Sequence, residues 1–565
     1  MSENDKWAWF SEEDPVPALL KPEPSTSKTE ALGLHLDIIA PDATKTPAGS
    51  AALGKAVAFH LDGKTEAAIK ELQSAIEGGD NLAELYSALG HIQFELQRFS
   101  DAAQSYLKAA HADPKNKTAS YNQGVCLEKS ERWKEACDAF QKALDVDSKR
   151  LEARLGLGIC QLHAGAAEKA LDAFDQCLKA KPDLDAAQFG KAVALHLAGK
   201  ADQADALYRK LLARNSNSEE LLANLIAAGI ARKDVAATKE FSERLLKLLP
   251  GSVAALEGLA TAAFAKGDFE AASKHCAKLV EAAPRSFEAW FNLGVASHEV
   301  GRLDQAAKAY AQAVKIRPDS GPAHANLGAI LQQQGDLAGA RKEHEKALQL
   351  SPELNTAIWN LALVSERHGD FEDAEGLYSR LVGKHPELDD VWFRLGYVRL
   401  QRSDFSGSVQ AFESCLKRRN EWVEAHLNLG TAHWRRGDGL AARKSFEKAL
   451  AADPKSVDAI RGLAVLAMER KDLEQAFELQ SKLIALGQRS PELFYNTGLL
   501  LQKSGMFEDA VKHYRQALNE NPNIAEALLN LGHALKALGQ EDEARSCWRK
   551  ALESNPELAA SYFSS

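Results

Sequence analysis

A 34-residue period that runs through almost the whole chain constrains the fold more than any other feature of this sequence. Fifteen consecutive segments align without an insertion or deletion; they start at residues 49, 83, 117, 151, 185, 219, 253, 287, 321, 355, 389, 423, 457, 491 and 525, and the last ends at Leu558. Repetition at a fixed period of about 20–50 residues is typical of repeat proteins that stack one supersecondary unit. The sequence therefore predicts one elongated array, although 565 residues could also hold several globular domains.

Four positions of the repeat carry nearly fixed residue types, when positions are numbered 1 to 34. Position 8 is Gly or Ala in fourteen repeats, position 20 is Ala in thirteen, and positions 15 and 32 are Gly and Pro in ten each. Small residues at positions 8 and 20 let two helices approach closely. Glycine at position 15 can end a helix in a left-handed conformation, and proline at position 32 stops the next helix. Mostly apolar residues at positions 4, 7, 11, 17 and 24 have the spacing of a packed helical face.

This pattern resembles the tetratricopeptide repeat, and the resemblance covers residues 49–558, about nine-tenths of the chain. It implies an all-α fold, a right-handed superhelical solenoid of about fifteen antiparallel helix pairs. Such arrays are stabilised mainly by contacts between neighbouring repeats.

Three repeats depart from the pattern: the sixth (219–252), the eleventh (389–422) and the thirteenth (457–490). The sixth has Ile226 at position 8, Lys233 at position 15 and Thr238 at position 20. Neutral drift is one interpretation. The other is that the bulky residue at position 8 makes the sixth repeat a flexible joint.

The two ends of the sequence differ from the array. Residues 1–48 hold nine acidic and four basic side chains together with several prolines, a composition that predicts a disordered leader. Within it, the apolar segment 32–39 could cap the first repeat. After the repeats, residues 559–565 form a short tail. Terminal repeats need a covered face, so we expect either that Tyr562 and Phe563 fold back or that a second copy forms a homodimer through this end.

The sequence offers no recognisable catalytic chemistry. Seven cysteines without a C-x-x-C pair and sixteen scattered histidines indicate neither a disulfide framework nor a metal site. No phosphate-binding or H-E-x-x-H motif occurs, so we predict no catalytic residues, no cofactor and no metal, and a protein that is not an enzyme. Without a basic run or a long apolar stretch, neither nucleic-acid binding nor membrane insertion is expected. A cytoplasmic location follows from this elimination.

In the tetratricopeptide fold the first helix of each repeat lines the concave groove, where position 6 is the most informative. It is asparagine in eight repeats: Asn122, Asn224, Asn292, Asn326, Asn360, Asn428, Asn496 and Asn530. An amide can pair with both the N–H and the C=O of an extended peptide. The series is similar to the asparagine ladder in the superhelical region of O-linked N-acetylglucosamine transferase, whose catalytic domain has no counterpart here. Asparagine is also common at this position in generic repeats, so packing is the alternative.

Position 5 adds aromatic residues beside these amides, among them Phe291, Trp359 and Phe393. They predict anchors for a bound peptide; the alternative is that they cover neighbouring helices. Arg394 interrupts the asparagine series at position 6 and is the cationic member of this predicted peptide-binding groove.

The leader contains an aromatic cluster, Trp7, Trp9 and Phe10, flanked by acids. Loose aromatics in a disordered segment predict a docking motif, either for a partner or for this protein's own groove; a fortuitous sequence is the alternative.

Together these features predict a non-catalytic scaffold or adaptor that binds other proteins or extended peptides in its concave groove. Two alternatives remain open at this point. One is a self-associating structural assembly protein, and the other is a substrate-recognition subunit of a separate transferase.

Overall fold

The computed structural model describes residues 47–79 and 82–559. The predictions made for the leader and the tail, including the docking motif of Trp7, Trp9 and Phe10, the segment 32–39 and the residues Tyr562 and Phe563, lie outside these described residues.

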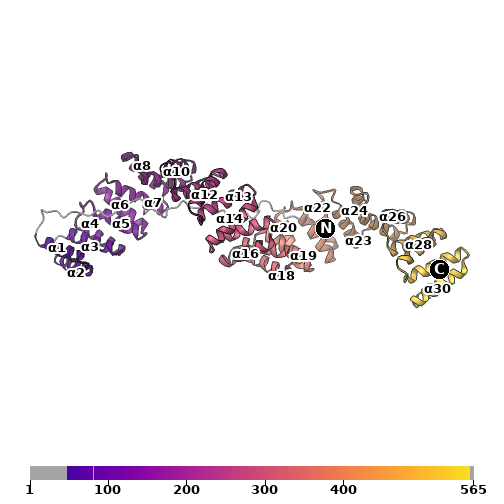
Figure 1. Cartoon of the computed structure of the whole chain (residues 1–565). Helices are drawn as coiled ribbons and strands as arrows, with labels where there is room; N and C mark the ends of the chain where they lie inside the picture. Colours follow the sequence, from indigo (N-terminus) through magenta and orange to yellow (C-terminus); the bar gives the residue numbers. More distant parts are fainter. Residues whose placement is uncertain (1–46, 80–81, 560–565) are drawn as a thin grey trace. The chain divides into compact units, whose positions relative to one another are not determined.

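The described chain divides into two compact bodies: an N-terminal body, residues 47–318, and a C-terminal body, residues 319–559. Each body consists of α-helices that follow one another as packed pairs in chain order (Figure 1). Thirty α-helices and no strand occur in the described residues. The prediction of an all-α repeat solenoid is confirmed.

The helices of the N-terminal body are α1 (Pro47–Leu61), α2 (Thr65–Glu77), α3 (Leu82–Glu95), α4 (Phe99–Ala112), α5 (Ala119–Lys129), α6 (Trp133–Val146), α7 (Leu151–His163), α8 (Ala167–Ala180), α9 (Asp185–Leu197), α10 (Ala201–Arg214), α11 (Glu219–Ala231), α12 (Val235–Leu248), α13 (Val253–Ala265), α14 (Phe269–Ala282), α15 (Phe287–Glu299) and α16 (Leu303–Ile316).

The helices of the C-terminal body are α17 (Gly321–Gln333), α18 (Leu337–Leu350), α19 (Asn355–His368), α20 (Phe371–Lys384), α21 (Asp389–Gln401), α22 (Phe405–Leu416), α23 (Val423–Arg435), α24 (Gly439–Ala452), α25 (Val457–Glu469), α26 (Leu473–Ala485), α27 (Pro491–Lys503), α28 (Phe507–Glu520), α29 (Ala525–Ala537) and α30 (Glu541–Ser554), followed by a short 3-10 turn, η3 (Pro556–Leu558).

Capping residues at two repeat positions begin many of these helices. Serine at position 34 caps the first helix of a repeat, as Ser252 does by accepting a hydrogen bond from the Ala255 N–H at 3.3 Å. Aspartate at position 16 caps the second helix, as Asp268 does for the Ala271 N–H at 3.0 Å. Each cap satisfies a backbone donor that has no partner inside the helix.

The turn between the two helices of a repeat requires a left-handed residue at position 15. The ten glycines there have φ between 68° and 89°. The five repeats without this glycine keep the same backbone, because Gln97, Glu131, Lys233, Ser403 and Lys471 have φ between 56° and 63°. The turn geometry is therefore common to all fifteen repeats, and five side chains bear its strain.

We expect Lys233→Gly to raise the free energy of unfolding by about 1 kcal/mol, because glycine removes the strain of a side chain at positive φ. The matched control is Lys266→Gly. Lys266 is also an exposed lysine in an interhelical turn, but its φ is −95°, so glycine there should cost about 1 kcal/mol. Urea unfolding monitored by circular dichroism would measure both. Equal effects of the two substitutions would contradict the assignment of strain.

Aromatic rings at position 24 of the second helix form the contact that joins one repeat to the next. Phe140 of α6 lies against glycines of two first helices. A Cβ atom added at Gly124 of α5 would lie 2.7 Å from the ring, and one at Gly156 of α7 would lie 2.6 Å from it. Phe446 makes the same double contact with Gly430 and Gly462. Each ring therefore packs on the backbone of its own repeat and of the following one.

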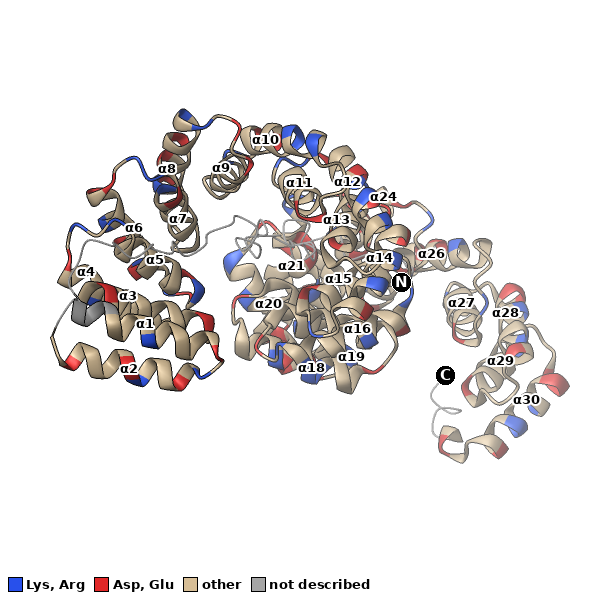
Figure 2. Cartoon of the chain, turned by 60° about the vertical axis from the view of Figure 1, so that its left-hand side comes forward, with Lys and Arg blue, Asp and Glu red and all other residues tan. Residues whose placement is uncertain are grey.

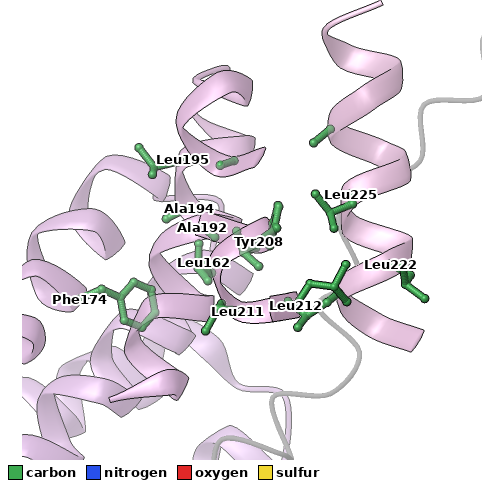
Figure 3. Packing of buried hydrophobic residues seen from close by; sticks show 14 of the residues in the cluster. Leu162, Phe174, Ala192, Ala194, Leu195, Tyr208, Leu211, Leu212, Leu222 and Leu225 are labelled. Atoms are coloured by element: carbon green, nitrogen blue, oxygen red, sulfur yellow. The ribbon is translucent and has the colours of Figure 1, made fainter. Parts of the chain in front are cut away.

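Buried apolar side chains continue this packing along the N-terminal body. Figure 3 shows part of one cluster to which seven successive helices, α7 to α13, contribute; Leu162, Phe174 and Tyr208 are among its residues. Phe174 and Tyr208 are fully buried. Within this cluster, side chains of neighbouring repeats complete one another's core.

In the irregular sixth repeat, two unusual residues compensate for each other. Ile226 replaces the small residue at position 8 and is fully buried, while Ser242 occupies position 24, where most repeats have a large side chain. Both side chains pack against Gly258 of α13. Because the added volume at one position matches the lost volume at the other, this packing favours neutral drift over a flexible joint.

Position 24 of the ninth repeat is a histidine, His344, in place of the usual aromatic ring. It is fully buried against Gly328, and neither ring nitrogen has a hydrogen-bond partner in the described structure. Burial lowers the pKa of His344 to about 4, because a charged imidazolium would lose its hydration there.

This lowered pKa gives the C-terminal body a specific acid sensitivity. In the unfolded chain His344 takes up a proton near pH 6.5, whereas in the folded chain it does so only near pH 4. The free energy of unfolding is therefore highest above pH 6.5 and decreases as the pH drops towards 4, because protons bind the unfolded chain more tightly. Between pH 7 and pH 5 the free energy of unfolding of His344→Phe should therefore decrease by about 2 kcal/mol less than that of the wild type. Urea unfolding at the two pH values would measure the difference, with the exposed His111→Ala as control. An unchanged pH dependence in His344→Phe would contradict it.

Candidate functional site

The predicted groove residues lie on the first helices of their repeats, and the structure gives the asparagines at position 6 two kinds of environment. Four are buried, with 0 to 5% of their surface exposed: Asn122, Asn224, Asn292 and Asn360. The other four are partly exposed: Asn326, Asn428, Asn496 and Asn530. A peptide approaching from solvent would meet the second group more readily.

The side chain at position 24 of the preceding repeat, sixteen residues before position 6, explains part of the difference between buried and partly exposed asparagines. This side chain packs against the first helix that carries position 6. Tyr106 is such a residue, and its hydroxyl is hydrogen-bonded to the Asn122 amide. Three of the four phenylalanines at position 24 are followed by glycine at position 6, whereas five tyrosines and His344 are followed by asparagine or arginine. Several asparagines therefore also contribute to packing between repeats, as the alternative interpretation held.

Asn428 departs from this pairing, because Phe412 precedes it and offers no polar atom. Its Nδ2 instead donates to the Glu424 carbonyl of its own helix, at 2.9 Å. Asn530 has the same arrangement: Nδ2 donates to the Glu526 carbonyl at 3.0 Å and to the Tyr495 hydroxyl at 3.1 Å. In both residues the amide nitrogen is held by the protein, and Oδ1 remains as an acceptor on a partly exposed side chain.

The aromatic residues at position 5 are fixed by the rings at position 24 of their own repeats. Ring centroids lie 5.6 Å apart for Phe291 and Tyr310, and 5.7 Å apart for Trp359 and Tyr378. Phe393 packs on Phe412 at 5.7 Å. Phe291 is buried, whereas Trp359 and Phe393 remain partly exposed. One edge of each ring thus contributes to the core, and the partly exposed rings are held in fixed orientations.

Arg394 is held in a network that the sequence did not reveal. Its Nη1 donates to Glu366 Oε1 at 2.9 Å, and Glu366 Oε2 accepts a hydrogen bond from the Tyr378 hydroxyl at 2.8 Å. Only 16% of the Arg394 side chain and 11% of the Glu366 side chain are exposed. The guanidinium is therefore neutralised by a carboxylate of the preceding repeat, and it connects α19 to α21. A signal was present in the sequence, because Glu366 is the acid at position 12 of that repeat.

We expect Glu366→Gln to lower the free energy of unfolding by about 2 kcal/mol, because it leaves the mostly buried guanidinium of Arg394 without its counter-charge. Glu421→Gln, an exposed acid in the turn before α23, is the control and should change it by less than about 0.5 kcal/mol. Urea unfolding of the full chain measures both. A loss in Glu366→Gln no larger than in the control would mean that the ion pair adds nothing to stability.

The structure also has an apolar hollow that the sequence reasoning missed. It lies between α1 and α3, has a volume of about 320 Å³, and includes Val57, Leu61 and Ile92 in its lining. Leu61 is 80% exposed and Val57 47% exposed. At the rim, His60 Nε2 contacts Glu95 Oε2 at 2.7 Å. The apolar residues at positions 9 and 13 of the first repeat, Val57 and Leu61, are the signal that could have indicated it.

Charge and metal-binding groups are dispersed. Lys and Arg are interspersed with Asp and Glu over the helices (Figure 2). Within residues 47–79 and 82–559, no group of three or more His, Cys, Asp or Glu side chains could hold a metal ion. Nor does that part of the chain contain a helix with the length and apolar character needed to cross a membrane.

Comparison with protein families identifies the repeat. Three models described as tetratricopeptide repeat match the chain, the first at residues 87–150, 129–185, 236–286, 257–321, 299–355, 359–421 and 427–491, the second at 501–562 and the third at 186–218. The chain belongs to the tetratricopeptide repeat family. No curated protein matches it.

Solved structures that resemble parts of the chain include three repeat proteins. The MamA protein is 25% identical, with a TM-score of 0.29, and the match covers 31% of this chain and 96% of MamA. YrrB, described as a tetratricopeptide protein with an unusual peptide-binding site, is 17% identical, with a TM-score of 0.32 and coverage of 34% and 97%. The Cut9–Hcn1 complex of the APC/C is 14% identical, with a TM-score of 0.32 and coverage of 84% and 94%.

Membership of this family assigns a general role. Tetratricopeptide repeats form surfaces for protein–protein interaction, and proteins built from them are typically non-catalytic. This chain is a protein-interaction scaffold in that general sense. The repeats give neither its partner nor the mode of binding, which must be argued from individual residues.

Proposed function

We propose that the chain is a scaffold that binds extended peptide segments on the groove face of its first helices, and that the C-terminal body contains the main site. The observation that carries this proposal is the arrangement of Asn428 and Asn530. Each uses Nδ2 on a carbonyl of its own helix, which directs a preorganised Oδ1 acceptor away from that bond. An acceptor of this kind pairs with a peptide N–H whatever the peptide's sequence.

The aromatic side chains at position 5 would supply the apolar part of this site. Trp359 and Phe393 are partly exposed, and each is fixed from behind by a buried ring of its own repeat. Phe393 also stacks on Trp422 at 4.5 Å, and the Arg419 guanidinium lies 3.9 Å from the Trp422 ring. Rigid aromatic anchors lose little conformational entropy on binding, which is why binding surfaces are enriched in them.

The remaining predicted groove residues would contribute to the proposed site in different ways, depending on how exposed they are. Asn326 and Asn496 are partly exposed and would add further backbone contacts, whereas Asn122, Asn292 and Asn360 are buried and would contribute mainly through packing. Arg394, already paired with Glu366, would orient the helices on either side of the peptide rather than bind a free anion. Several weak contacts in series give useful affinity through effective concentration.

Binding to selected peptides tests the role of the amides. Peptides chosen from a random display library against the full chain would be titrated by fluorescence anisotropy. We expect Asn428→Ala and Asn530→Ala each to weaken binding about five-fold, equivalent to ~1 kcal/mol, for peptides of unrelated sequence. The control is Asn523→Ala, an exposed asparagine in the turn before α29, which should leave the affinity unchanged. Equal affinities for all four proteins would exclude the amides from the site.

The leader is proposed as a second docking element. Trp7, Trp9 and Phe10 are three large apolar side chains among acids, a composition that fits short recognition motifs. Deleting residues 1–46 distinguishes its two modes of action. Tighter peptide binding after deletion would indicate that the leader competes for the groove of its own chain, whereas unchanged binding would assign it to another protein. The cytoplasmic location expected by elimination is also a proposal.

A further inference from the structure

The first repeat differs from most others at the position on which packing between repeats depends. Position 24 of this repeat is Leu72, whereas ten of the other fourteen repeats have phenylalanine, tyrosine or tryptophan there. Leu72 is fully buried and lines the apolar hollow between α1 and α3. A leucine side chain is shorter than an aromatic ring, so the space that a ring fills between two first helices stays partly open here.

The hollow lies on the groove face of the first two repeats. Its lining includes Leu53 at position 5 of the first repeat and Ala88 at position 6 of the second, the two positions assigned to the groove. Val57 and Leu61 continue the lining along α1. At 80%, Leu61 is the most exposed of the large apolar side chains in residues 47–79 and 82–559. Covering such a surface with another apolar group is favourable.

The polar groups at the rim of the hollow already contact one another. Glu95 Oε2 lies 2.7 Å from His60 Nε2, and Glu95 Oε1 lies 3.2 Å from His91 Nε2. An apolar segment that enters the hollow would therefore not have to cover a carboxylate without a partner, which would be costly. The hollow thus suits an aliphatic occupant better than a charged one.

The N-terminal residues outside the described part of the chain end directly at the helix that lines this hollow, because residue 46 precedes Pro47 of α1. Residues 32–39, LGLHLDII, include five leucines or isoleucines. The seven residues 40–46 join this segment to α1 and can span ~23–25 Å when extended. The lining residues of α1 run from Leu53 to Leu61, ~9–21 Å along the helix from Pro47. The segment can therefore reach the whole hollow.

We propose that residues 32–39 of the leader dock in this hollow and close the groove face at the N-terminal end of the array. In an extended segment the four aliphatic side chains at positions 32, 34, 36 and 38 of the chain share one face, which would enter the hollow. His35 and Asp37 lie on the opposite face, towards solvent. This docking does not depend on peptide binding in the C-terminal body.

The other apolar cluster of the leader, Trp7, Trp9 and Phe10, is the weaker candidate for this hollow. It is joined to α1 by 36 residues, 11–46, compared with seven for the segment 32–39. Effective concentration falls roughly as the −3/2 power of linker length, so the shorter connection gives a ~ten-fold higher local concentration. With residues 32–39 docked, residues 1–31 would be the part of the leader that can reach a partner.

Photo-cross-linking of the full chain tests the contact. With p-benzoylphenylalanine in place of Leu61, we expect the main cross-link to join α1 to the tryptic peptide 29–45, which contains the whole segment. The aromatic cluster lies in a different tryptic peptide, 7–28, because Lys21 is followed by proline. The matched control has the same group in place of Leu440, which is 72% exposed on α24, and should give no link to 29–45.

Three outcomes of this experiment would overturn the proposal. The first is a cross-link from position 61 to the peptide 7–28 instead of 29–45. The second is a protein in which no leader peptide is linked. The third is a link that forms only between isotope-labelled and unlabelled copies in a mixture, which would assign the hollow to the leader of a second copy.

Hydrogen exchange of α1 to α3 measures the stabilisation that docking provides. Leu36→Ser should raise the exchange rates about ten-fold, because a buried leucine contributes at least this much to a local opening equilibrium. Leu61→Ser should have the same effect, and the double variant should be no faster than either single one, since each removes the same contact. The control is Leu20→Ser, elsewhere in the leader, which should leave the rates unchanged. Unchanged rates in Leu36→Ser, or a ~hundred-fold increase in the double variant, would contradict docking.

Discussion

The packing of a side chain at position 24 on the backbone of two first helices is the contact on which the rest of this structure depends. Phe140 contacts Gly124 of its own repeat and Gly156 of the next, and a single added methyl group at either glycine would meet the ring at less than 3 Å. Phe174 and Phe446 likewise contact glycines of two repeats, so each of these rings is buried by two neighbours together. Stability is therefore shared between neighbours, and the array can be extended for fifteen repeats without a central core.

The same contact is related to which residue type occupies position 6. Position 6 lies where the ring of the preceding repeat meets the next first helix, so glycine mostly follows phenylalanine and an amide or guanidinium follows tyrosine. Asn122 is bound to Tyr106 and Arg394 to Glu366, whereas Asn428, preceded by Phe412, is bound through Nδ2 to a carbonyl of its own helix. Asn428 and Asn530, the two amides that carry the proposal, both have Nδ2 bound to a carbonyl of their own helix.

Much of the fold could be predicted from sequence, because the repeat displays its constraints fifteen times. Glycine at position 15 and the small residues at positions 8 and 20 gave the turn and the close helix contact correctly. The candidate site was less predictable, since a position number does not say how deep a side chain lies. Asn292 and Phe291 proved buried, and Arg394 proved to be paired with Glu366. The burial and pairing of these side chains depend on residues of neighbouring repeats, which the residue type at one repeat position does not reveal.

The sequence by itself determined the all-α repeat, the two helices of each unit and the family, because periodic small residues, turn glycines and prolines act locally. Only the tertiary structure decided how exceptions are accommodated. Lys233 adopts the left-handed turn of a glycine, and Ile226 is matched by a small Ser242. The reason is physical: local propensity repeats every 34 residues, whereas side-chain volume and hydrogen bonding are settled between side chains of successive repeats.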